Sequence, residues 1–440
     1  MAASSPDSIL IVGSGVFGLS TAYSLAQNPH YSSSTISVLD RSPFPSPDGS
    51  SIDTSRIIRA DYSDPAYAAL AAKCQEEWRK QGEDDLGGEG RYTESGLALV
   101  ANRGEQGESY VRSSFANIKS MMEVAGDLEG FQELSSKELI EQCVGTGGGT
   151  GSYGYINRRS GWADAEASMK WLRRKVEALG RVRFQRGEAS QLIKEGRTVV
   201  GVQLKDGKEL RASLVVLATG AWTGKLVDLR GRAAATGQVL VYMDITKEEQ
   251  EKFGKMPTLL NLSNGLFIIP PANKLLKIAR HGYGYSNPVQ IPNPNDPSET
   301  IEVSLPKTVV DDPTQVIPQE GEADCRAALR QMIPSLGDRP FRYSRICWYT
   351  DTPKGDFIIT YHPDFDGLFL ATGGSGHGFK FLPSIGDKIV DCIEGNCPSE
   401  FKEKWAWPKE MAENVVTEDG SRGGKSGLIL DVELKKGSKL

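Results

Sequence analysis

The sequence lacks the long apolar runs and the concentrated positive charge of membrane proteins and nucleic-acid-binding proteins. Its most apolar stretches, SLVVLATGAW and DGLFLATGG, have the length of strands rather than of membrane spans. The first residues, MAASSPDSIL, contain no charged segment followed by an apolar one, which argues against a secretory signal. Lys and Arg are spread along a chain whose formal net charge is -6. Because phosphate binding needs a concentrated basic surface, we expect neither a membrane nor a nucleic acid as partner.

Cysteine is scarce and irregularly placed. The six cysteines form no CxxC pair, which is typical of reduced thiols in an intracellular protein. No group of His, Cys and carboxylate residues has the spacing of metal ligands, so no metal site is expected. Glu166, Asp351 and Asp356 show no pairing that would indicate an acid/base site.

The sequence ends on Ser438-Lys439-Leu440, the tripeptide of a peroxisomal import signal. A random basic tail is the alternative. The preceding LKKG is of the flexible, accessible kind that a receptor-read tail needs, so we expect binding to the import receptor and a peroxisomal location. Because residues 408–440 are polar, we expect them to wrap the surface or to be disordered.

A chain of 440 residues exceeds one simple core, which predicts two domains. Residues 8–40 have the pattern strand, glycine-rich turn, helix, strand, a βαβ unit. Amphipathic patterns predict helices over residues 64–80 and 163–180 and in ADCRAALRQMIPSL. The segments VRFQRG, TVVGVQL and LRASLVVLATGAW predict strands that return to the first sheet.

The glycine-rich turn matches G-x-G-x-x-G directly after a strand and at the start of a helix. Its glycines permit a tight turn, a close approach of the backbone to a pyrophosphate, and contact of helix with strand. Phosphates then lie against free N–H groups at the helix N-terminus. Asp40 ends the second strand, where a carboxylate accepts the ribose hydroxyls. The predicted nucleotide-binding residues are Gly13, Ser14, Gly15, Val16, Phe17, Gly18 and Asp40.

The turn alone does not separate NAD from FAD. A later strand and glycine turn, LVVLATGAW over residues 214–222, favours FAD, because flavoproteins bring a second glycine turn from well down the chain to the same cofactor. Nicotinamide enzymes more often use one contiguous domain. An NAD-dependent dehydrogenase stays the alternative at this point, as does a flavoprotein without catalytic activity.

The C-terminal half carries more specific motifs. RICWYTDTP, FIITYHP and ATGGSGHGFKFLPSIG resemble the monomeric sarcosine oxidase and fructosyl amino acid oxidase (amadoriase) family of FAD-dependent amine oxidases. SILIVGSGVFGLSTAYSL, DTSRIIRADYSD and KLLKIARH fit the same family. The matches run in order from residue 8 to about residue 395, so the resemblance spans nearly the whole chain.

The resemblance implies an α/β fold: a glutathione-reductase-type FAD-binding domain, Rossmann-like and discontinuous in sequence, beside a mixed-sheet α+β substrate domain. The first domain is expected over residues 1–62, 155–230 and 345–395. The second is expected over residues 63–154 and 231–344. Residues 396–440 are expected to form a C-terminal tail that bears the peroxisomal signal. A monomer is expected.

The resemblance also implies that FAD is joined through its 8α-methyl group to a cysteine sulfur, and the matching position is Cys347. Alone, a cysteine among aromatic residues is usually a small core residue. The GSGHGFK motif about thirty residues later favours the thioether. The further cofactor-binding residues that we assign are Arg41, Ser55, Arg56, Gly374, Gly376, His377, Gly378, Phe379 and Lys380.

Catalysis in such a family transfers hydride from the substrate C–H bond to flavin N5, hydrolyses the imine and reduces O2 to H2O2. Arg59 and Lys380 match the family positions that bind the substrate carboxylate, and Arg56 matches one beside the flavin ring. Lys277, on an otherwise apolar strand, either reaches toward water or points into a cavity. It matches the lysine that activates oxygen. His281 matches a histidine of the substrate cavity.

The family oxidises secondary amines that carry an α-carboxylate, so the small-molecule partner is an N-substituted amino acid, with molecular oxygen as acceptor. SRIIRADYSDPAY resembles the fungal saccharopine/pipecolate oxidases and the sarcosine oxidases, which favours saccharopine, pipecolate or N-methyl amino acids. GFK followed by FLPSIG resembles the fructosyl amino acid oxidases, so deglycation of fructosyl (Amadori) amino acids is the alternative.

Overall fold

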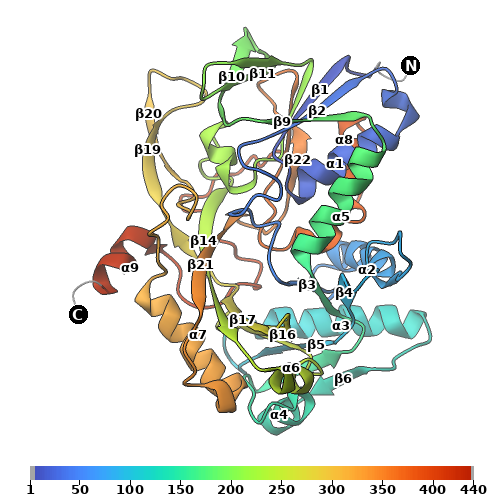
Figure 1. Ribbon diagram of the computed structural model, residues 1–440, viewed down its shortest axis with the longest axis vertical. Coiled ribbons are helices and arrows are strands. Elements are labelled where there is room, and N and C mark those ends of the chain that lie inside the picture. Colours follow the sequence, from blue (N-terminus) through green and yellow to red (C-terminus); the bar gives the residue numbers. More distant parts are fainter. Residues whose placement is uncertain (1–4, 438–440) are drawn as a thin grey trace.

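The structure is a computed structural model that describes residues 5–437. Two large sheets hold most of its strands and lie toward opposite ends of an elongated molecule (Figure 1). The tripeptide 438–440, to which the import signal is assigned, lies outside the described residues.

The first sheet contains the predicted βαβ unit. Its strands are parallel except β22, which pairs antiparallel with β23 at one edge. In spatial order they are β22 (Ile358–Tyr361), β23 (Leu368–Thr372), β13 (Leu214–Leu217), β1 (Ser8–Val12), β2 (Thr35–Asp40) and β9 (Val182–Arg186).

Both faces of this sheet are covered, which explains why its strands are apolar without alternation. Ile9 and Ile11 of β1 belong to a core that also contains residues of helices α1 (Val16–Gln27), α2 (Pro65–Arg79), α5 (Ala165–Ala178) and α8 (Ile385–Ile393). Leu10 and Val12 face a small antiparallel sheet of β10 (Ala189–Glu195), β11 (Thr198–Leu204) and β12 (Glu209–Arg211).

The second sheet is mixed and contains ten strands. Their order is β24 (Leu428–Ile429), β18 (Tyr285–Ser286), β14 (Ala234–Asp244), β17 (Leu275–Arg280), β16 (Leu266–Ala272), β15 (Thr258–Asn261), β5 (Leu97–Ala101), β7 (Tyr153–Asn157) and β6 (Phe131–Leu134), with β21 (Tyr343–Asp351) also pairing with β14.

Alternate residues of this sheet point to two different cores. Ala98 and Val100 of β5 join the core with α4 (Lys137–Val144), α6 (Lys247–Phe253), α7 (Gln319–Met332) and α9 (Leu430–Gly437). Leu97 and Leu99 point the other way, toward α3 (Glu108–Val124) and Cys347. The face that carries Cys347 is therefore the one opposite α7.

Short elements connect the sheets. A three-stranded sheet of β3 (Arg56–Ile58), β8 (Gly161–Ala163) and β4 (Tyr92–Thr93) lies between the two large sheets (Figure 1). The remaining elements are the hairpin β19 (Pro288–Pro292) and β20 (Thr300–Ser304) and the 3-10 turns η1 (Pro29–Tyr31), η2 (Gly220–Lys225), η3 (Pro334–Leu336) and η4 (Phe379–Phe381). Because β3 follows loop 42–55, the chain that leaves β2 of the first sheet passes between the two large sheets.

Most of the element predictions are confirmed. The expected helices are α2, α5 and α7, and Asp64 caps α2 by accepting from the backbone N–H groups of Ala66 and Tyr67. One strand assignment is wrong: TVVGVQL, as β11, joins the small sheet instead of returning to the first sheet. The RICWYTDTP segment forms β21 of the second sheet. The domain limits stay a prediction.

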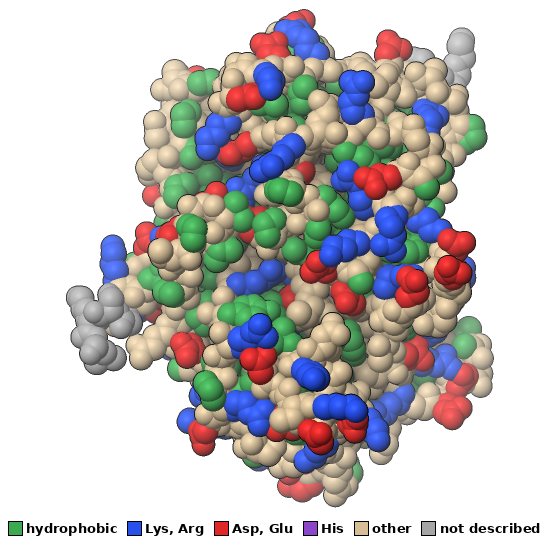
Figure 2. Space-filling view, in the orientation of Figure 1, with side chains coloured by type: hydrophobic (Ala, Val, Ile, Leu, Met, Phe, Trp, Pro, Cys, Tyr) green, Lys and Arg blue, Asp and Glu red, His purple; other side chains and the backbone are tan. Residues whose placement is uncertain are grey.

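The surface carries both charge signs. Figure 2 shows Lys and Arg interspersed with Asp and Glu over the visible face. None of the helices within residues 5–437 combines the length and the apolar character needed to cross a membrane.

Candidate active site

The glycine-rich turn is held by contacts that exclude larger residues. Gly13 adopts a φ of +105°, and a Cβ there would collide with the carbonyl oxygen of Ala218. A Cβ on Gly15 would lie 2.8 Å from Ser51 Oγ, which accepts from the N–H of Val16 at 3.0 Å. Gly18 packs against Gly13. Loop 42–55 therefore lies over the N-terminus of α1, where backbone N–H groups favour a phosphate.

The carboxylate at the end of β2 contacts the same turn. Asp40 accepts from the N–H and the Oγ of Ser14, at 2.8 and 2.6 Å. The next residue, Arg41, lies 4.5 Å from the centre of the Trp222 ring and pairs with Asp48 and Asp311. Turn and acid thus meet as the nucleotide pattern predicts.

A large cavity starts at this turn. Its lining includes most residues that the sequence assigned to the cofactor: Gly13, Ser14, Gly15, Val16, Phe17, Asp40, Arg41, Arg56, Gly374, Gly376, Gly378 and Phe379. Gly18 and Ser55 line neither this cavity nor the next; the Ser55 carbonyl accepts from Lys277 at 2.8 Å.

A second, smaller cavity adjoins the first on the Cys347 face of the second sheet. Its lining brings together Cys347, Arg59, Lys277, His281, His377 and Lys380, which lie far apart in sequence. Arg56, Tyr349, Gly376 and Phe379 line both cavities, so the two meet between β3, β21 and the loop before η4.

Cys347 lies on β21 and lines the smaller cavity, two residues before Tyr349, which lines both cavities. Its thiol is free and buried, and Nη2 of Arg56 lies 3.6 Å from the sulfur. A free thiol that lines a cavity beside a cation is available for a bond to a bound group, which a thiol packed in a core is not.

Two buried cations in the smaller cavity lack an ion-pair partner within residues 5–437. The Nη1 atom of Arg59 has no hydrogen-bond partner, and the guanidinium lies 4.9 Å from the centre of the Tyr62 ring. Lys380 Nζ donates to Tyr62 Oη and to the His377 carbonyl, both at 2.8 Å. Burial, then Arg59, lowers the pKa of Lys380. Since buried unpaired charge is costly, this corner favours an anion.

His377 has both ring nitrogens engaged by protein atoms. Tyr62 Oη lies 2.9 Å from Nδ1, and the Gly355 carbonyl lies 2.8 Å from Nε2. The ring also stacks on Phe357 at 4.7 Å between centroids. Burial and Lys380 lower the pKa of His377, so the ring is neutral at pH 7, and the contacts assign its hydrogen to Nε2.

Lys277 lies on β17 and lines the smaller cavity instead of reaching toward water. Its Nζ donates to Asp53 Oδ2 at 2.7 Å, and both side chains are almost fully buried. Arg56 pairs with the same carboxylate. Sequence reasoning missed Asp53, although a carboxylate three residues before Arg56 is a signal that could have identified it.

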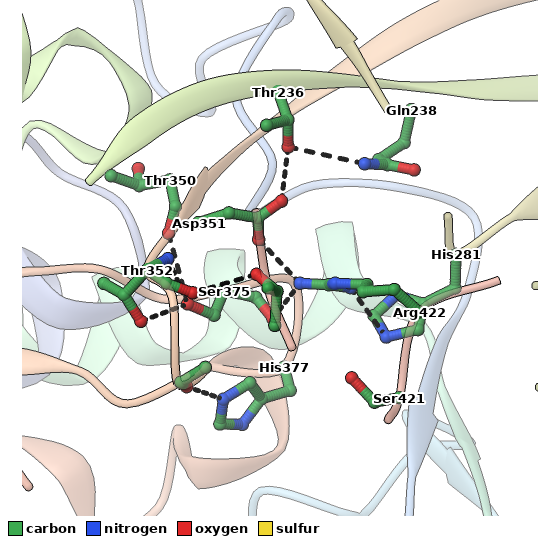
Figure 3. A network of polar contacts seen from close by, with 12 residues as sticks. Thr236, Gln238, His281, Thr350, Asp351, Thr352, Ser375, His377, Ser421 and Arg422 are labelled. Carbon is green, nitrogen blue, oxygen red and sulfur yellow. Dashed lines mark hydrogen bonds and ion pairs between the residues drawn. The ribbon is translucent and has the colours of Figure 1, made fainter. Parts of the chain in front are cut away.

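The C-terminal segment contributes a second residue that the sequence did not reveal. Arg422 Nη2 donates to Asp351 Oδ1 at 2.6 Å and to the Ser375 carbonyl at 2.8 Å (Figure 3). Its Nη1 lies 2.7 Å from His281 Nε2. Burial and Arg422 together lower the pKa of His281, so this ring too is neutral at pH 7.

The surface position expected for residues 408–440 is therefore wrong for part of that segment. We call residues 417–424 the C-terminal strap. Thr417 Oγ1 donates to the Thr352 carbonyl at 2.9 Å, and the N–H of Glu418 donates to the Pro353 carbonyl at 2.8 Å. These bonds place Arg422 behind His281 and Tyr349. A polar composition cannot reveal such a buried strap, because its single buried cation pairs across 71 residues.

The residues present fit an FAD. The α1 N-terminus with Gly13 and Gly15 would hold the pyrophosphate, Asp40 the ribose, and Arg56 with Tyr349 and Gly376 the flavin end beside Cys347. Within residues 5–437, no three His, Cys, Asp or Glu side chains gather in a way that could hold a metal ion.

Comparisons with known proteins also support FAD as the cofactor. The family described as FAD dependent oxidoreductase matches residues 8–392. An amino acid oxidase of Aspergillus flavus is 32% identical over 449 residues, covering 88% of this chain and 93% of the relative. The L-saccharopine oxidase of Schizosaccharomyces pombe is 30% identical and covers 91% and 93%.

Solved structures agree with the sequence relatives. The deglycating enzyme fructosamine oxidase (Amadoriase II) of Aspergillus fumigatus, in complex with FSA, matches with a TM-score of 0.81 at 30% identity, over 98% of this chain and 96% of that chain. This likeness confirms the predicted fold class. The chain therefore belongs to the FAD dependent oxidoreductase family, as the motifs predicted, with amino acid oxidases among its relatives and FAD as its cofactor.

Proposed function

We propose that the protein oxidises α-amino acids whose nitrogen carries a second carbon substituent, with oxygen as the electron acceptor. The observation that carries the proposal is the unpaired Nη1 of buried Arg59, beside Lys380, in the cavity that Cys347 also lines. A carboxylate there would satisfy the orphan donor, offset the charge of Arg59 and favour the protonated form of Lys380, whose pKa burial lowers.

In the overall reaction, oxygen oxidises the amine by two electrons. The amine loses two electrons and two protons, and water then splits the imine into an amine and a carbonyl compound. Oxygen takes up the two electrons and two protons as H2O2. FAD, when bound, supplies the two-electron acceptor that links these half-reactions.

Different side chains of the smaller cavity serve the oxidation of the substrate and the reduction of oxygen. Arg59 and Lys380 bind and orient the carboxylate, which fixes the reacting carbon near the larger cavity. Neutral His281 contacts the substrate without adding charge. Lys277, which lines the same cavity, carries the positive charge that stabilises the anion formed as oxygen is reduced.

The substrate class rests on the sequence motif and on the relatives. The SRIIRADYSDPAY segment and the relative named L-saccharopine oxidase favour saccharopine, pipecolate or N-methyl amino acids. Fructosyl amino acids are the second candidate, because the matched solved structure is a fructosamine oxidase. All of these substrates share the secondary amine and the α-carboxylate.

An anaerobic substrate panel tests this proposal. Purified protein is mixed with L-saccharopine, L-pipecolate, sarcosine or a fructosyl amino acid, and loss of the flavin absorbance is followed. We expect bleaching by at least one of the first three, and recovery on adding air with one H2O2 per cycle. Bleaching by the fructosyl compound alone supports the second candidate. Failure of all four to bleach the flavin contradicts both.

We also propose a thioether between Cys347 and the flavin. Its support is the position of the free thiol in the smaller cavity, next to Arg56, which lines both cavities. Flavin absorbance should stay with acid-precipitated protein, and Cys347→Ala should release it into the supernatant. Cys325→Ala, at another buried free cysteine, serves as the matched control. Flavin that washes out of the wild-type precipitate would refute the bond.

The peroxisomal location is a proposal that rests on the tripeptide 438–440. A fluorescent protein fused before residue 1 should collect in peroxisomes, and deletion of residues 438–440 should leave it diffuse. An unchanged distribution after deletion contradicts the signal. A peroxide-producing reaction fits an organelle that disposes of peroxide. Size-exclusion chromatography tests the monomer expected from the resemblance.

A further inference from the structure

Asp53 is a buried carboxylate that lines neither cavity, yet three chain segments converge on it. Oδ2 accepts from Lys277 Nζ of β17 at 2.7 Å and from Arg56 at the start of β3. Oδ1 accepts from Tyr242 Oη of β14 at 2.6 Å and from the N–H of Thr54 at 2.8 Å. Its side chain is only 1% exposed. Both oxygens are therefore fully used by protein donors.

The charges around Asp53 are unbalanced. Besides Lys277 and Arg56, the guanidinium of Arg345 on β21 lies close enough to act on the same carboxylate. Burial opposes ionisation of Asp53, but Lys277, Arg56 and Arg345 hold its pKa well below the usual range. Tyr242, the other titratable group in contact, stays protonated because burial raises its pKa. One carboxylate thus serves three buried cations.

Lys277 is the cation most sensitive to this arrangement. Burial lowers its pKa to about 8, Arg56 and Arg345 push in the same direction, and Asp53 is the group that counteracts them. Arg56 and Arg345 stay charged in any case, because guanidinium groups do not lose their proton in proteins. Without Asp53, the ammonium of Lys277 would face burial and two positive charges alone.

We propose that Asp53 is the positioning residue that keeps Lys277 protonated and holds its ammonium group at the wall of the smaller cavity, which Cys347 also lines. It contacts no substrate and acts through Lys277. The inference rests on the proposed function and deepens it, because it concerns the half-reaction in which oxygen reoxidises the flavin. It predicts that removing the Asp53 charge impairs reoxidation while the carboxylate corner, formed by Arg59 and Lys380, stays intact.

The test separates the two half-reactions in Asp53→Asn, which keeps the shape and removes the charge. Anaerobic reduction by substrate should change less than about threefold, whereas reoxidation by oxygen at pH 7.5 should slow by about tenfold or more. The pH above which reoxidation slows should move about one unit or more below that of the wild type. Equal slowing of both half-reactions, or an unmoved pH profile, overturns the proposal.

A spectral titration gives a readout without turnover. The absorbance of the oxidised flavin should show a transition near pH 8 in the wild type, because loss of the Lys277 charge changes the field at the ring. The transition should disappear in Lys277→Met and move to lower pH in Asp53→Asn. A transition that survives Lys277→Met, or one at the same pH in Asp53→Asn and the wild type, contradicts the assignment.

Two controls distinguish charge from packing. Tyr242→Phe removes one hydrogen bond to Asp53 but leaves its charge, so the pH profile should stay in place. Asp48→Asn removes another buried carboxylate of loop 42–55, whose partners are Arg41 and Thr308, and the profile should again stay in place. A shift in either control as large as that in Asp53→Asn attributes the effect to disruption of the loop and overturns the proposal.

If Asp53→Asn does not accumulate as folded protein, Asp53→Asn/Lys277→Met removes both members of the buried pair. Its reoxidation rate should lie within about threefold of that of Lys277→Met, because residues that act through one another are not additive. A further tenfold loss contradicts the proposal. Failure of every amine to reduce the wild-type flavin instead refutes the proposed function, and the spectral titration still tests Asp53.

Discussion

At the scale of single residues, the candidate active site is distinguished by buried cations. Arg59, Lys277, Lys380 and Arg422 are each almost fully buried, and they differ in what balances them. Lys277 and Arg422 have carboxylate partners, whereas Arg59 and Lys380 have none within residues 5–437. Each residue of the first pair thus has a carboxylate partner from the fold, and we propose that the carboxylate of the substrate serves the second pair.

Lys277→Met tests directly whether Lys277 promotes reoxidation of the flavin by oxygen. The substitution keeps an unbranched side chain that is one atom shorter and removes its charge, so reoxidation should slow by about a hundredfold while reduction changes little. In the wild type, reoxidation should slow as the pH rises through about 8, where Lys277 loses its proton. Stopped-flow measurement of both half-reactions checks this. A parallel loss in both would mean that Lys277 acts on the substrate instead.

At the scale of elements, the C-terminal strap completes the site from outside the two large sheets. Arg422 donates to the Ser375 carbonyl in the GSGHGFK loop and contacts His281, so one side chain links that loop to a residue of the smaller cavity. Ser375 has a positive φ of 41°, a conformation that costs energy unless neighbours hold it. The strap therefore fixes the loop that lies between the two cavities.

Arg422→Met should destabilise the protein, because it leaves the Asp351 carboxylate buried without its partner. The expected loss of unfolding free energy is about 3–5 kcal/mol. Urea unfolding followed by flavin fluorescence measures it. Lys425→Met, at an exposed residue just after the strap, should have little effect, and Arg422→Met/Asp351→Asn should recover part of the loss. An unchanged unfolding midpoint in Arg422→Met would contradict the role of the strap.

The GSGHGFK loop yields a separate prediction. Gly376 has a φ of +64°, and a Cβ there would collide with the Tyr349 ring. Because Gly376 and Tyr349 line both cavities, Gly376→Ala should displace the ring and alter flavin binding. The visible flavin spectrum and the flavin content measure this effect. Gly395→Ala, also at positive φ but with open space around it, controls for backbone strain.

Sequence alone could predict the elements whose chemistry is local. The GSGVFG turn with Asp40, the free Cys347 and the apolar strand that bears Lys277 are each contained in one short segment. Arg422 could not be assigned, because its partner Asp351 lies 71 residues away. For Asp53 only the local pairing with Arg56 was within reach of the sequence, since Lys277 lies 224 residues away and the pairing depends on where β17 crosses the second sheet. Strand β11 was assigned to the wrong sheet because its local residue pattern predicts a strand but does not determine which strands it pairs with.

At the scale of the whole molecule, two buried neutral histidines make stability depend on pH. Burial lowers the pKa values of His281 and His377 well below their usual value. Their folded forms therefore bind fewer protons than the unfolded chain as the pH falls below about 6.5, and stability is lost in that direction. The slope is about 1.4 kcal/mol of unfolding free energy per pH unit for each histidine.

Urea unfolding at pH 7 and at pH 5 measures this dependence. The midpoint should be lower at pH 5, and His377→Gln should reduce the difference. His30→Gln, at an exposed residue outside both cavities, should leave the difference unchanged. A midpoint that is equal at the two pH values, or higher at pH 5, would contradict the neutral burial of His281 and His377.

The proposed function requires that the smaller cavity binds the carboxylate of an N-substituted amino acid for oxidation by FAD. The most direct measurement is the anaerobic rate of flavin reduction by such an amino acid and by its carboxamide. The acid should reduce wild-type flavin about a hundredfold faster at low concentration, and Arg59→Met should bring the two rates close together. Equal rates for acid and amide in the wild type would contradict the claim.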